Sequence, residues 1–589
     1  MKGTAHAIAN NDIVYLWWTY DKKIENCLGF SVRRLVNGKS PQALPAFVGF
    51  EPPDNEAPND TEKHNTDDWP VQSYQWKDLF VPEETDVSYE IVPMTGTPGN
   101  MTAKEDLKLT TPPTRATDTF GPVQVFFNRG IISTQSLANK LPKGPSGAPK
   151  ADSLQAHIKD SSDQIRKALS GEAVEALTSL LARARKDNGK CYLALYELTD
   201  NFLIEQIEKT KRHIELILSN ADGSKNMTGD DGKKRTVKVY DKTNAATRKR
   251  LTKSLGAAFH DRLLPKGNYI GHNKFVVYVD MDGKPRTVLT GSTNWTATGL
   301  CAQSNNVIVI DDPKVAERYL EYWNLLLEDS AEQAAPLRNA NAVDPTDIDL
   351  KGNAGKIRIW FSPNTKAKQK PKKAPPGPPD MKEVFKRIRF ARDGVLFLVF
   401  NPGQPSILTE IRTIAEQRKA SGKQFFVRGA ISDSKVSGEF ATRVYNDSIL
   451  TAPNQLITGI GGIPDHFSFW QKELAKLGHA VIHDKIVVID PFRDDCCVIT
   501  GSHNLGYKAS YSNDENLVIL SNNRMVAEAY AAHILDVVNH YNWRYKLVKD
   551  WKAGKKSSFN DLANDDSWQD KYFKGSFLAS RDRFFFSNF

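Results

Sequence analysis

Cysteine is scarce in this sequence, and long apolar runs are missing from it. Only five cysteines occur among 589 residues, an odd number without the regular spacing of a disulfide framework. This usage is typical of proteins from a reducing compartment. No run of about 18 apolar residues occurs, and the N-terminal residues contain no uninterrupted apolar stretch before a cleavage site. We therefore expect no cleavable signal peptide, and a protein that is cytoplasmic or exported by another route.

Zinc-ligand spacing is also lacking among the cysteines and histidines, so the sequence predicts no structural metal site. The charge is only moderately one-sided, with a net +9 and a pI near 8.9. Such an excess favours phosphate-rich partners, either an anionic lipid surface or nucleic acid, and does not choose between them. Much of it is local, at 233–235, 248–250 and 366–373. The last of these runs lies among Pro and Gly residues and is predicted to be a linker.

The first 112 residues alternate apolar and polar positions in short segments that Pro, Gly, Asn and Asp clusters separate. This pattern predicts a small antiparallel β-sandwich. Titratable residues do not cluster there, so we expect an accessory domain without chemistry of its own.

The remainder of the chain repeats itself. Each half is predicted to contain an opening strand, a second strand, a helix and a third strand. The ranges are 123–127, 192–196, 202–211 and 214–218 in the first half, and 357–361, 396–400, 407–417 and 424–428 in the second. Alternating strands and helices indicate an α/β fold with mixed sheets covered by helices. We place the halves at 113–350 and 351–589, and expect the tail 583–586 to dock as a terminal strand.

Later in each half the correspondence extends to single residues. Val315-Ala316-Glu317 matches Val526-Ala527-Glu528 at an offset of 211 positions, and the same offset relates His272-x-Lys274 to His483-x-Lys485. Each His-x-Lys opens an apolar strand, where residues two apart share a face. The imidazole and the ammonium of each pair should therefore project together, as a phosphate site requires.

Two further features accompany each pair. An aspartate follows the second pair as His-x-Lys-x4-Asp at Asp490, whereas Asp280 comes one residue later after the first pair, which predicts a local bulge. Gly-Ser-x-Asn follows in both halves, with Ser292 and Asn294 in the first and Ser502 and Asn504 in the second. One such match is weak, but two in register are specific. We interpret the serines as turn or phosphate-contact residues rather than nucleophiles.

On these motifs, residues 113 to 550 resemble the two-motif phospholipase D superfamily, and in particular the bacterial-type phospholipases D. The resemblance implies two tandem αβα halves facing each other around one shared active site that needs no metal or other cofactor. It implies that His272 is the nucleophile, forming a phosphohistidine, and that His483 is the general acid. The predicted catalytic set is His272, Lys274, Asp280, His483, Lys485 and Asp490, with Asn294, Asn504, Ser292 and Ser502 at the substrate phosphate.

The halves differ at one informative position. Glu515 follows Ser502 by thirteen residues, and the same step from Ser292 reaches Asn305. A carboxylate hydrogen-bonded to a ring nitrogen fixes the tautomer and raises the basicity of a histidine, and the resemblance implies that Glu515 has this role. The sequence does not tell which histidine Glu515 supports, so the nucleophile and the acid could be exchanged.

Two substrate classes fit these motifs. The leading prediction is hydrolysis or transfer of phospholipid head groups, for example conversion of phosphatidylcholine to phosphatidic acid, with a phospholipid or membrane surface as partner. The aromatic segment 456–470 would suit an interface-seeking enzyme. The alternative is a nuclease, with 233–253 tracking a nucleic-acid backbone. A catalytically inactive binding module is disfavoured because both His-Lys pairs are intact. No obligate protein partner is evident, and a monomer or a homodimer is expected.

Overall fold

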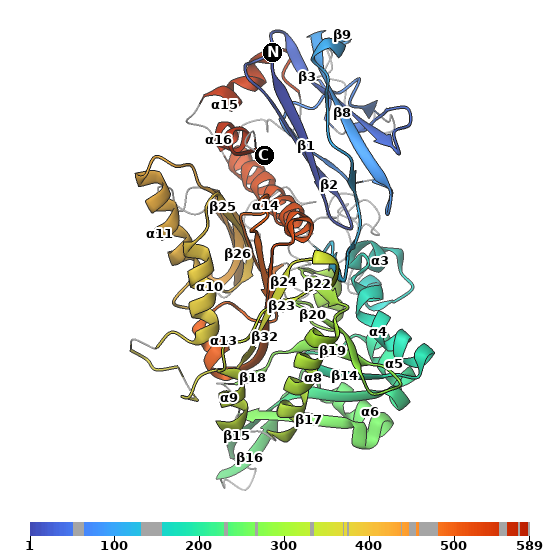
Figure 1. The fold of residues 1–589 in the computed structure, drawn as a ribbon, viewed down its shortest axis with the longest axis vertical. Coiled ribbons are helices and arrows are strands. Elements are labelled where there is room, and N and C mark those ends of the chain that lie inside the picture. Colours follow the sequence, from blue (N-terminus) through green and yellow to red (C-terminus); the bar gives the residue numbers. More distant parts are fainter. Residues whose placement is uncertain are drawn as a thin grey trace. The chain divides into compact units, whose positions relative to one another are not determined.

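The computed structural model divides into two compact units, Met1–Asp118 together with Glu528–Phe589, and Thr119–Ala527 (Figure 1). It describes every residue except 47, 51–63, 80, 131–155, 229–233, 266–268, 330–334, 369, 374–375, 437–438, 447–454, 459–480, 553–561, 575–577 and 587–589. Within that part of the chain, no helix has both the length and the apolar character that a membrane crossing would demand.

Antiparallel sheets form the N-terminal part of the first unit, as the alternating sequence predicts. One sheet has the order β1-β2-β7 and another has the order β10-β8-β3-β4, with β9 and β11 also paired to β8. Their bounds are β1 Gly3–Ala9, β2 Val14–Tyr20, β7 Gln75–Asp78, β3 Cys27–Val36, β4 Gln42–Ala43, β8 Asp86–Thr97, β9 Asn100–Ala103, β10 Leu109–Thr110 and β11 Thr114–Arg115. Aromatic and branched side chains of both sheets share one core, which includes Trp18, Phe30 and Ile91.

C-terminal residues complete this core, although the sequence pattern placed them with the second half. The segment contains η6 (Asp566–Gln569), α15 (Asp570–Phe573) and α16 (Leu578–Phe586). The tail is thus a helix, not the terminal strand that we predicted. It does dock, because the indole Nε1 of Trp17 donates to the Phe586 carbonyl over 3.0 Å.

Trp568 is the residue of this segment on which the shared core depends most. Its ring centroid lies 5.7 Å from that of Phe30 and 5.7 Å from that of Tyr74, and its Nε1 donates to the Cys27 carbonyl. We expect Trp568→Ala to lower the free energy of unfolding of this unit by about 3–5 kcal/mol, the usual cost of deleting a buried aromatic side chain. Urea unfolding monitored by tryptophan fluorescence measures this loss of stability. A loss below about 1 kcal/mol would contradict the packing role of Trp568.

The second unit holds two mixed sheets with the same strand order. The first runs β13-β22-β20-β19-β14-β15-β16 and the second β24-β32-β31-β30-β25-β26-β27. In the first sheet the bounds are β13 Val123–Phe127, β22 Asn306–Ile310, β20 Pro285–Gly291, β19 Lys274–Val279, β14 Lys190–Leu195, β15 Ile214–Thr228 and β16 Lys234–Tyr240. In the second they are β24 Lys356–Ser362, β32 Asn513–Ser521, β31 Cys497–Gly501, β30 Lys485–Ile489, β25 Gly394–Phe400, β26 Phe426–Val436 and β27 Glu439–Asn446. The predicted α/β fold with two related halves is confirmed.

Helices cover these sheets where the sequence has apolar residues at helical spacing. The first sheet packs α4 (Ala173–Asp187), α5 (Asn201–Lys209) and α6 (Ala245–Leu255) through one apolar cluster. Helix α8 (Pro313–Glu328) also contacts β20, β14 and β19. The α5 and α8 helices begin where Asp200 and Asp312 accept hydrogen bonds from backbone N–H groups of the first turn. On the second sheet, α10 (Pro379–Arg389) and α11 (Ile407–Ala420) share a core with the strands (Figure 1).

The two halves meet through α8 and through exchanged strand pairs. The ring of Tyr322 on α8 stacks on Phe361 of β24, with centroids 4.1 Å apart. Short β18 (Ile270–Gly271) of the first half pairs with β32 of the second. Reciprocally, β29 (Val481–Ile482) of the second half pairs with β21 (Gln303–Ser304) of the first. Each His-x-Lys motif therefore begins directly after a strand that is bonded to the opposite half.

Candidate active site

The exchanged strand pairs decide which histidine meets which orienting side chain. Strand β18 ends at Gly271 opposite Asp514, so His272 and Glu515 follow side by side. The Nδ1 atom of His272 lies 3.4 Å from Glu515 Oε2. In the reciprocal pair, the Nδ1 atom of His483 lies 2.8 Å from Asn305 Oδ1. Each histidine is thus oriented by the opposite half, and Glu515 supports His272, which answers the question that the sequence left open.

Each lysine contacts the histidine of its own motif. The Lys274 ammonium donates to the His272 carbonyl over 2.8 Å, and the Lys485 ammonium lies 3.3 Å from both ring nitrogens of His483. An aromatic ring from the neighbouring strand flanks each pair. Tyr196 is 4.8 Å from the ring of His272, and Phe400 is 5.0 Å from the ring of His483. The sequence analysis did not identify these two rings as site residues, although Tyr196 directly follows β14 and Phe400 ends β25.

Burial sets the electrostatics of this cluster. The exposed fraction is 4% for His272, 2% for Lys274, 6% for His483 and 0% for Lys485. Burial and the charge of Lys274, against the opposing Glu515 carboxylate, lower the pKa of His272 to about 4. Burial likewise lowers the pKa of Lys274 to about 7 and, with the Lys274 charge, holds the pKa of Lys485 well below its usual range. His272 is therefore neutral at pH 7, the form in which an imidazole can attack phosphorus.

Glu515 stays ionised in spite of its complete burial. Burial acts to raise its pKa, but the charges of His272 and His503 and a hydrogen bond from Asn513 lower the pKa to about 2. The Asn513 amide donates over 2.6 Å, and the Asn504 backbone N–H donates over 3.2 Å. A fixed carboxylate at Nδ1 of His272 leaves Nε2 as the nitrogen that can act as a nucleophile.

The Gly-Ser-x-Asn residues separate into two groups. The hydroxyls of Ser292 and Ser502 accept hydrogen bonds from the Asn306 and Asn516 backbone N–H groups, both over 3.0 Å. Both serines are 0% exposed. Our assignment of the serines to the substrate phosphate is therefore corrected, because their hydroxyls hold the backbone together. In contrast, Oδ1 of Asn294 and Oδ1 of Asn504 are buried and have no hydrogen-bond partner within the described residues.

The motif aspartates, which we predicted as part of the catalytic set, lie outside this cluster. Asp490 accepts the backbone N–H groups of Arg392, Asp393 and Gly394 over 2.8–2.9 Å. Its carboxylate therefore closes a turn at the far end of β30 rather than touching His483. This is a correction to its predicted catalytic role.

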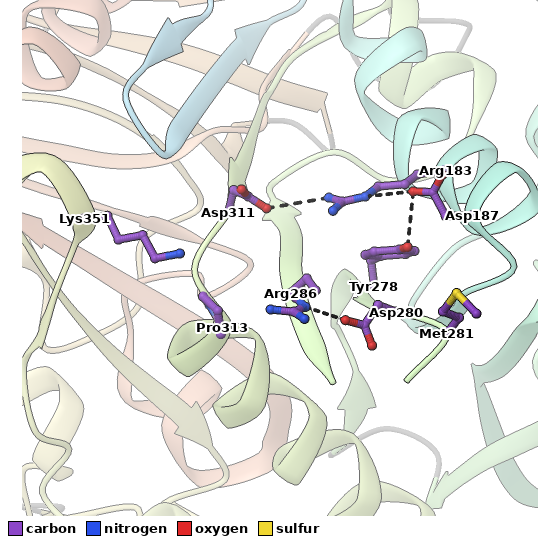
Figure 2. Close-up of a pocket in the computed structure, with 9 residues that line it drawn as sticks. All are labelled: Arg183, Asp187, Tyr278, Asp280, Met281, Arg286, Asp311, Pro313 and Lys351. Atoms are coloured by element: carbon purple, nitrogen blue, oxygen red, sulfur yellow. Dashed lines mark hydrogen bonds and ion pairs between the residues drawn. The ribbon is translucent and has the colours of Figure 1, made fainter. Parts of the chain in front are cut away.

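Asp280 lies at the far end of β19, in a surface pocket of about 430 Å³ (Figure 2). Its carboxylate pairs with Arg286 over 2.6 Å and accepts the backbone N–H groups of Asp282 and Lys284. The strand register shifts between Tyr278 and Val279, which confirms the predicted irregularity. Asp280 therefore stabilises a hairpin and is likewise corrected from catalytic to structural.

Other predicted features fall outside the site or outside the described residues. The aromatic side chains at 467, 469 and 470 lie outside the described residues. In the basic segment, Arg248 pairs with Asp261 over 2.7 Å. His503 is 2% exposed and lies 3.2 Å from Asp380, so it is a buried residue that stabilises the loop of the second Gly-Ser-x-Asn motif. In the described part of the chain, no group of three or more His, Cys, Asp or Glu side chains is arranged to hold a metal ion.

The low pKa of His272 has a measurable consequence. Because the nucleophile must be neutral, kcat/KM should fall tenfold per pH unit as the pH drops below about 4. Glu515 raises the pKa of His272, so Glu515→Gln should move this acid limb to a still lower pH. It should also lower the plateau by about 10²–10⁴-fold through loss of tautomer control. A pH-rate profile of both proteins measures this, and an acid limb that moves upward would refute the pairing.

Residues 177–326 and 467–535 match the family described as "Cardiolipin synthase, PLD-like domain". No curated protein matches the sequence significantly. Solved structures that resemble it include phosphatidylserine synthase from Haemophilus influenzae Rd KW20, with 12% identity, 71% of this chain and 94% of that chain covered and a TM-score of 0.38.

Two further similar structures are a phospholipase D family member, Nuc, from Salmonella typhimurium and the yeast tyrosyl-DNA phosphodiesterase. For Nuc the identity is 18%, with 35% of this chain and 94% of that chain covered and a TM-score of 0.19. For the yeast protein the identity is 11%, with 57% of this chain and 84% of that chain covered and a TM-score of 0.27. The two matched segments lie one in each half, and each contains one of the paired His-x-Lys motifs.

Proposed function

We propose that this protein is a phospholipase D-type phosphodiesterase that cleaves or exchanges the head group of phospholipids through a phosphohistidine intermediate. The observation that carries the proposal is the convergence of His272 with Lys274 and His483 with Lys485, each histidine oriented by the opposite half. Because the two histidines have different hydrogen-bonding partners, they suit different roles in catalysis. A carboxylate beside His272 raises its basicity for attack, whereas the neutral Asn305 leaves His483 free to give up a proton.

The chemical steps follow from these positions. Nε2 of His272 attacks phosphorus while His483 protonates the departing alcohol oxygen, which forms a P–N bond and breaks a P–O bond. Neutral His483 then removes a proton from water or from an acceptor alcohol, which attacks the phosphohistidine and releases His272. Lys274, Lys485, Asn294 and Asn504 are proposed to hold the non-bridging oxygens during both steps. The negative phosphate favours the ammonium forms of both lysines, whose charge then takes the place of a metal ion, so the reaction should proceed in excess EDTA.

Two arginines of the basic segment are already paired within the protein. A nucleic-acid backbone needs several unpaired basic groups along one track. In the described part of that segment, Arg248 pairs with Asp261 and Arg250 pairs with Glu208 through two hydrogen bonds. These two guanidinium charges are therefore already compensated.

Head-group release in EDTA tests the proposal. We expect the wild type to release choline from phosphatidylcholine vesicles and to form phosphatidylethanol when ethanol is added. Both products should be lost in His272→Ala. The same proteins are then assayed on plasmid and single-stranded DNA. Cleavage of DNA without any head-group release would replace the lipid proposal with the nuclease alternative.

A further inference from the structure

The structure contains a second carboxylate at the phosphate site that the mechanism does not use. Glu197 directly follows Tyr196, whose ring flanks His272. Its Oε2 accepts a hydrogen bond from the Asn294 amide over 2.8 Å. The backbone fixes it there, because the Glu197 carbonyl accepts the Trp295 N–H over 3.0 Å. Glu197 is half-buried, whereas Glu515 is 0% exposed, so only Glu197 is open to a substrate.

Glu197 is not required by the fold, as comparison of the halves shows. Leu195 lies opposite Lys274 in the first sheet, and Val399 lies opposite Lys485 in the second. Two residues further along, the first half has Glu197 and the second half has Asn401. A carboxylate needed only to build the strand end would be expected in both halves, so its presence in one points to function.

Acceptors gather around this carboxylate. The charge of Asp241 acts on Glu197 and, together with burial, raises its pKa, against the opposing charge of Lys274. Asn294 is 6% exposed, and its Oδ1 has no hydrogen-bond partner within the described residues. The Asn294 oxygen without a partner and the Glu197 carboxylate, which accepts only from the Asn294 amide among the described hydrogen bonds, place acceptors next to the ammonium of Lys274 that would hold a phosphate oxygen. A substrate group with N–H donors and positive charge would satisfy them.

We propose that Glu197, with Asn294, selects phospholipids whose head group carries a primary ammonium. This inference rests on the proposed function and specifies its substrate. A primary ammonium offers three N–H donors, whereas a quaternary ammonium offers none and a glycerol head group offers no charge. A site built for such donors rejects the analogue that lacks them, because its own polar groups remain unpaired. The Glu197 carboxylate also repels the neighbouring phosphates of a nucleic-acid chain.

Phosphatidylethanolamine and phosphatidylcholine vesicles of otherwise identical composition provide the test. We expect the wild type to prefer phosphatidylethanolamine at least tenfold in kcat/KM. Glu197→Gln keeps the oxygen that accepts from Asn294 but removes the charge, and it should reduce this preference to about threefold or less. The matched control is Glu215→Gln, a half-buried carboxylate held by Lys190 and His260, which should keep the wild-type preference.

Bis(p-nitrophenyl) phosphate separates this inference from the proposed function, because it lacks an ammonium group. Glu197→Gln should cleave it severalfold faster than the wild type, since one negative charge near the phosphate is removed. An equal loss on both lipids and on this compound would reduce Glu197 to a positioning residue for Asn294 and overturn the inference. If the wild type cleaves this compound but prefers phosphatidylcholine or single-stranded DNA to phosphatidylethanolamine, the inference is overturned. The phosphodiesterase activity itself would still stand. A wild type inactive on every substrate would overturn both.

Discussion

His483→Ala is expected to stall as a phosphohistidine enzyme when the substrate has a good leaving group. The p-nitrophenolate of bis(p-nitrophenyl) phosphate departs without a proton, so His272 can still attack phosphorus in this variant. The second step needs His483 to activate water, so turnover should fall by about 10³–10⁶-fold. A burst of one p-nitrophenolate per enzyme should precede the slow phase. Mass spectrometry of the acid-labile adduct should locate it on His272.

His272→Ala should show neither the burst nor the adduct, because the nucleophile is absent. His260→Gln is the matched control, since this histidine pairs with Glu215 on the first sheet and should turn over normally. An adduct on His483 in the His272→Ala protein would mean that His483 is the nucleophile and His272 the general acid. Such a result would mean that the neutral partner Asn305, and not the carboxylate of Glu515, supports the nucleophile.

Arg262→Met is expected to lower the free energy of unfolding of the second unit strongly. Arg262, on β17 (Phe259–Pro265), pairs with Asp514 over 2.7 Å and with Asp329 over 2.7 Å. The exposed fractions of the Arg262 and Asp514 side chains are 2% and 1%. Removing the guanidinium would break a buried ion pair to each of the two carboxylates, which costs about 3–5 kcal/mol. A lower urea midpoint for the second unit would report it.

Arg286→Met is the control for that experiment. Its ion pair with Asp280 has similar geometry, but the Arg286 side chain is 39% exposed. Exposed pairs contribute about 0–1 kcal/mol, so the urea midpoint should hardly move. Equal losses in the two variants would show that burial of the Arg262 pair adds nothing. Because Asp514 precedes Glu515, Arg262→Met should also lower activity, whereas Arg286→Met should not.

Local periodicity explains why so much of the fold could be predicted. The predicted opening strand at 123–127 is β13 at the same bounds, and the predicted helix 407–417 lies within α11. These elements depend on the alternation of apolar residues and on caps within a few residues, which a sequence displays directly. The bulge beside Asp280 was predictable for a related reason, since comparison of the two repeats exposes a single extra residue.

The site could be predicted only in part. The sequence identified His272, Lys274, His483 and Lys485, because the repeat and the His-x-Lys spacing mark them in register. It assigned Asp280 and Asp490 to the same site because they belong to the same motif. In the structure both lie at the far ends of their strands, where a strand of five or six residues separates them from the histidines. Motif membership therefore did not imply proximity.

The sequence by itself determined the α/β class, the duplication, both His-Lys pairs and the difference between Glu515 and Asn305. The tertiary structure alone decided that Glu515 supports His272, that Asn305 supports His483, and that Glu528–Phe589 folds with the N-terminal strands. The first group of features follows from spacing within a short stretch of chain. The second depends on strand pairs and cores between residues hundreds of positions apart, where the partner is chosen by three-dimensional packing and leaves no periodic signal.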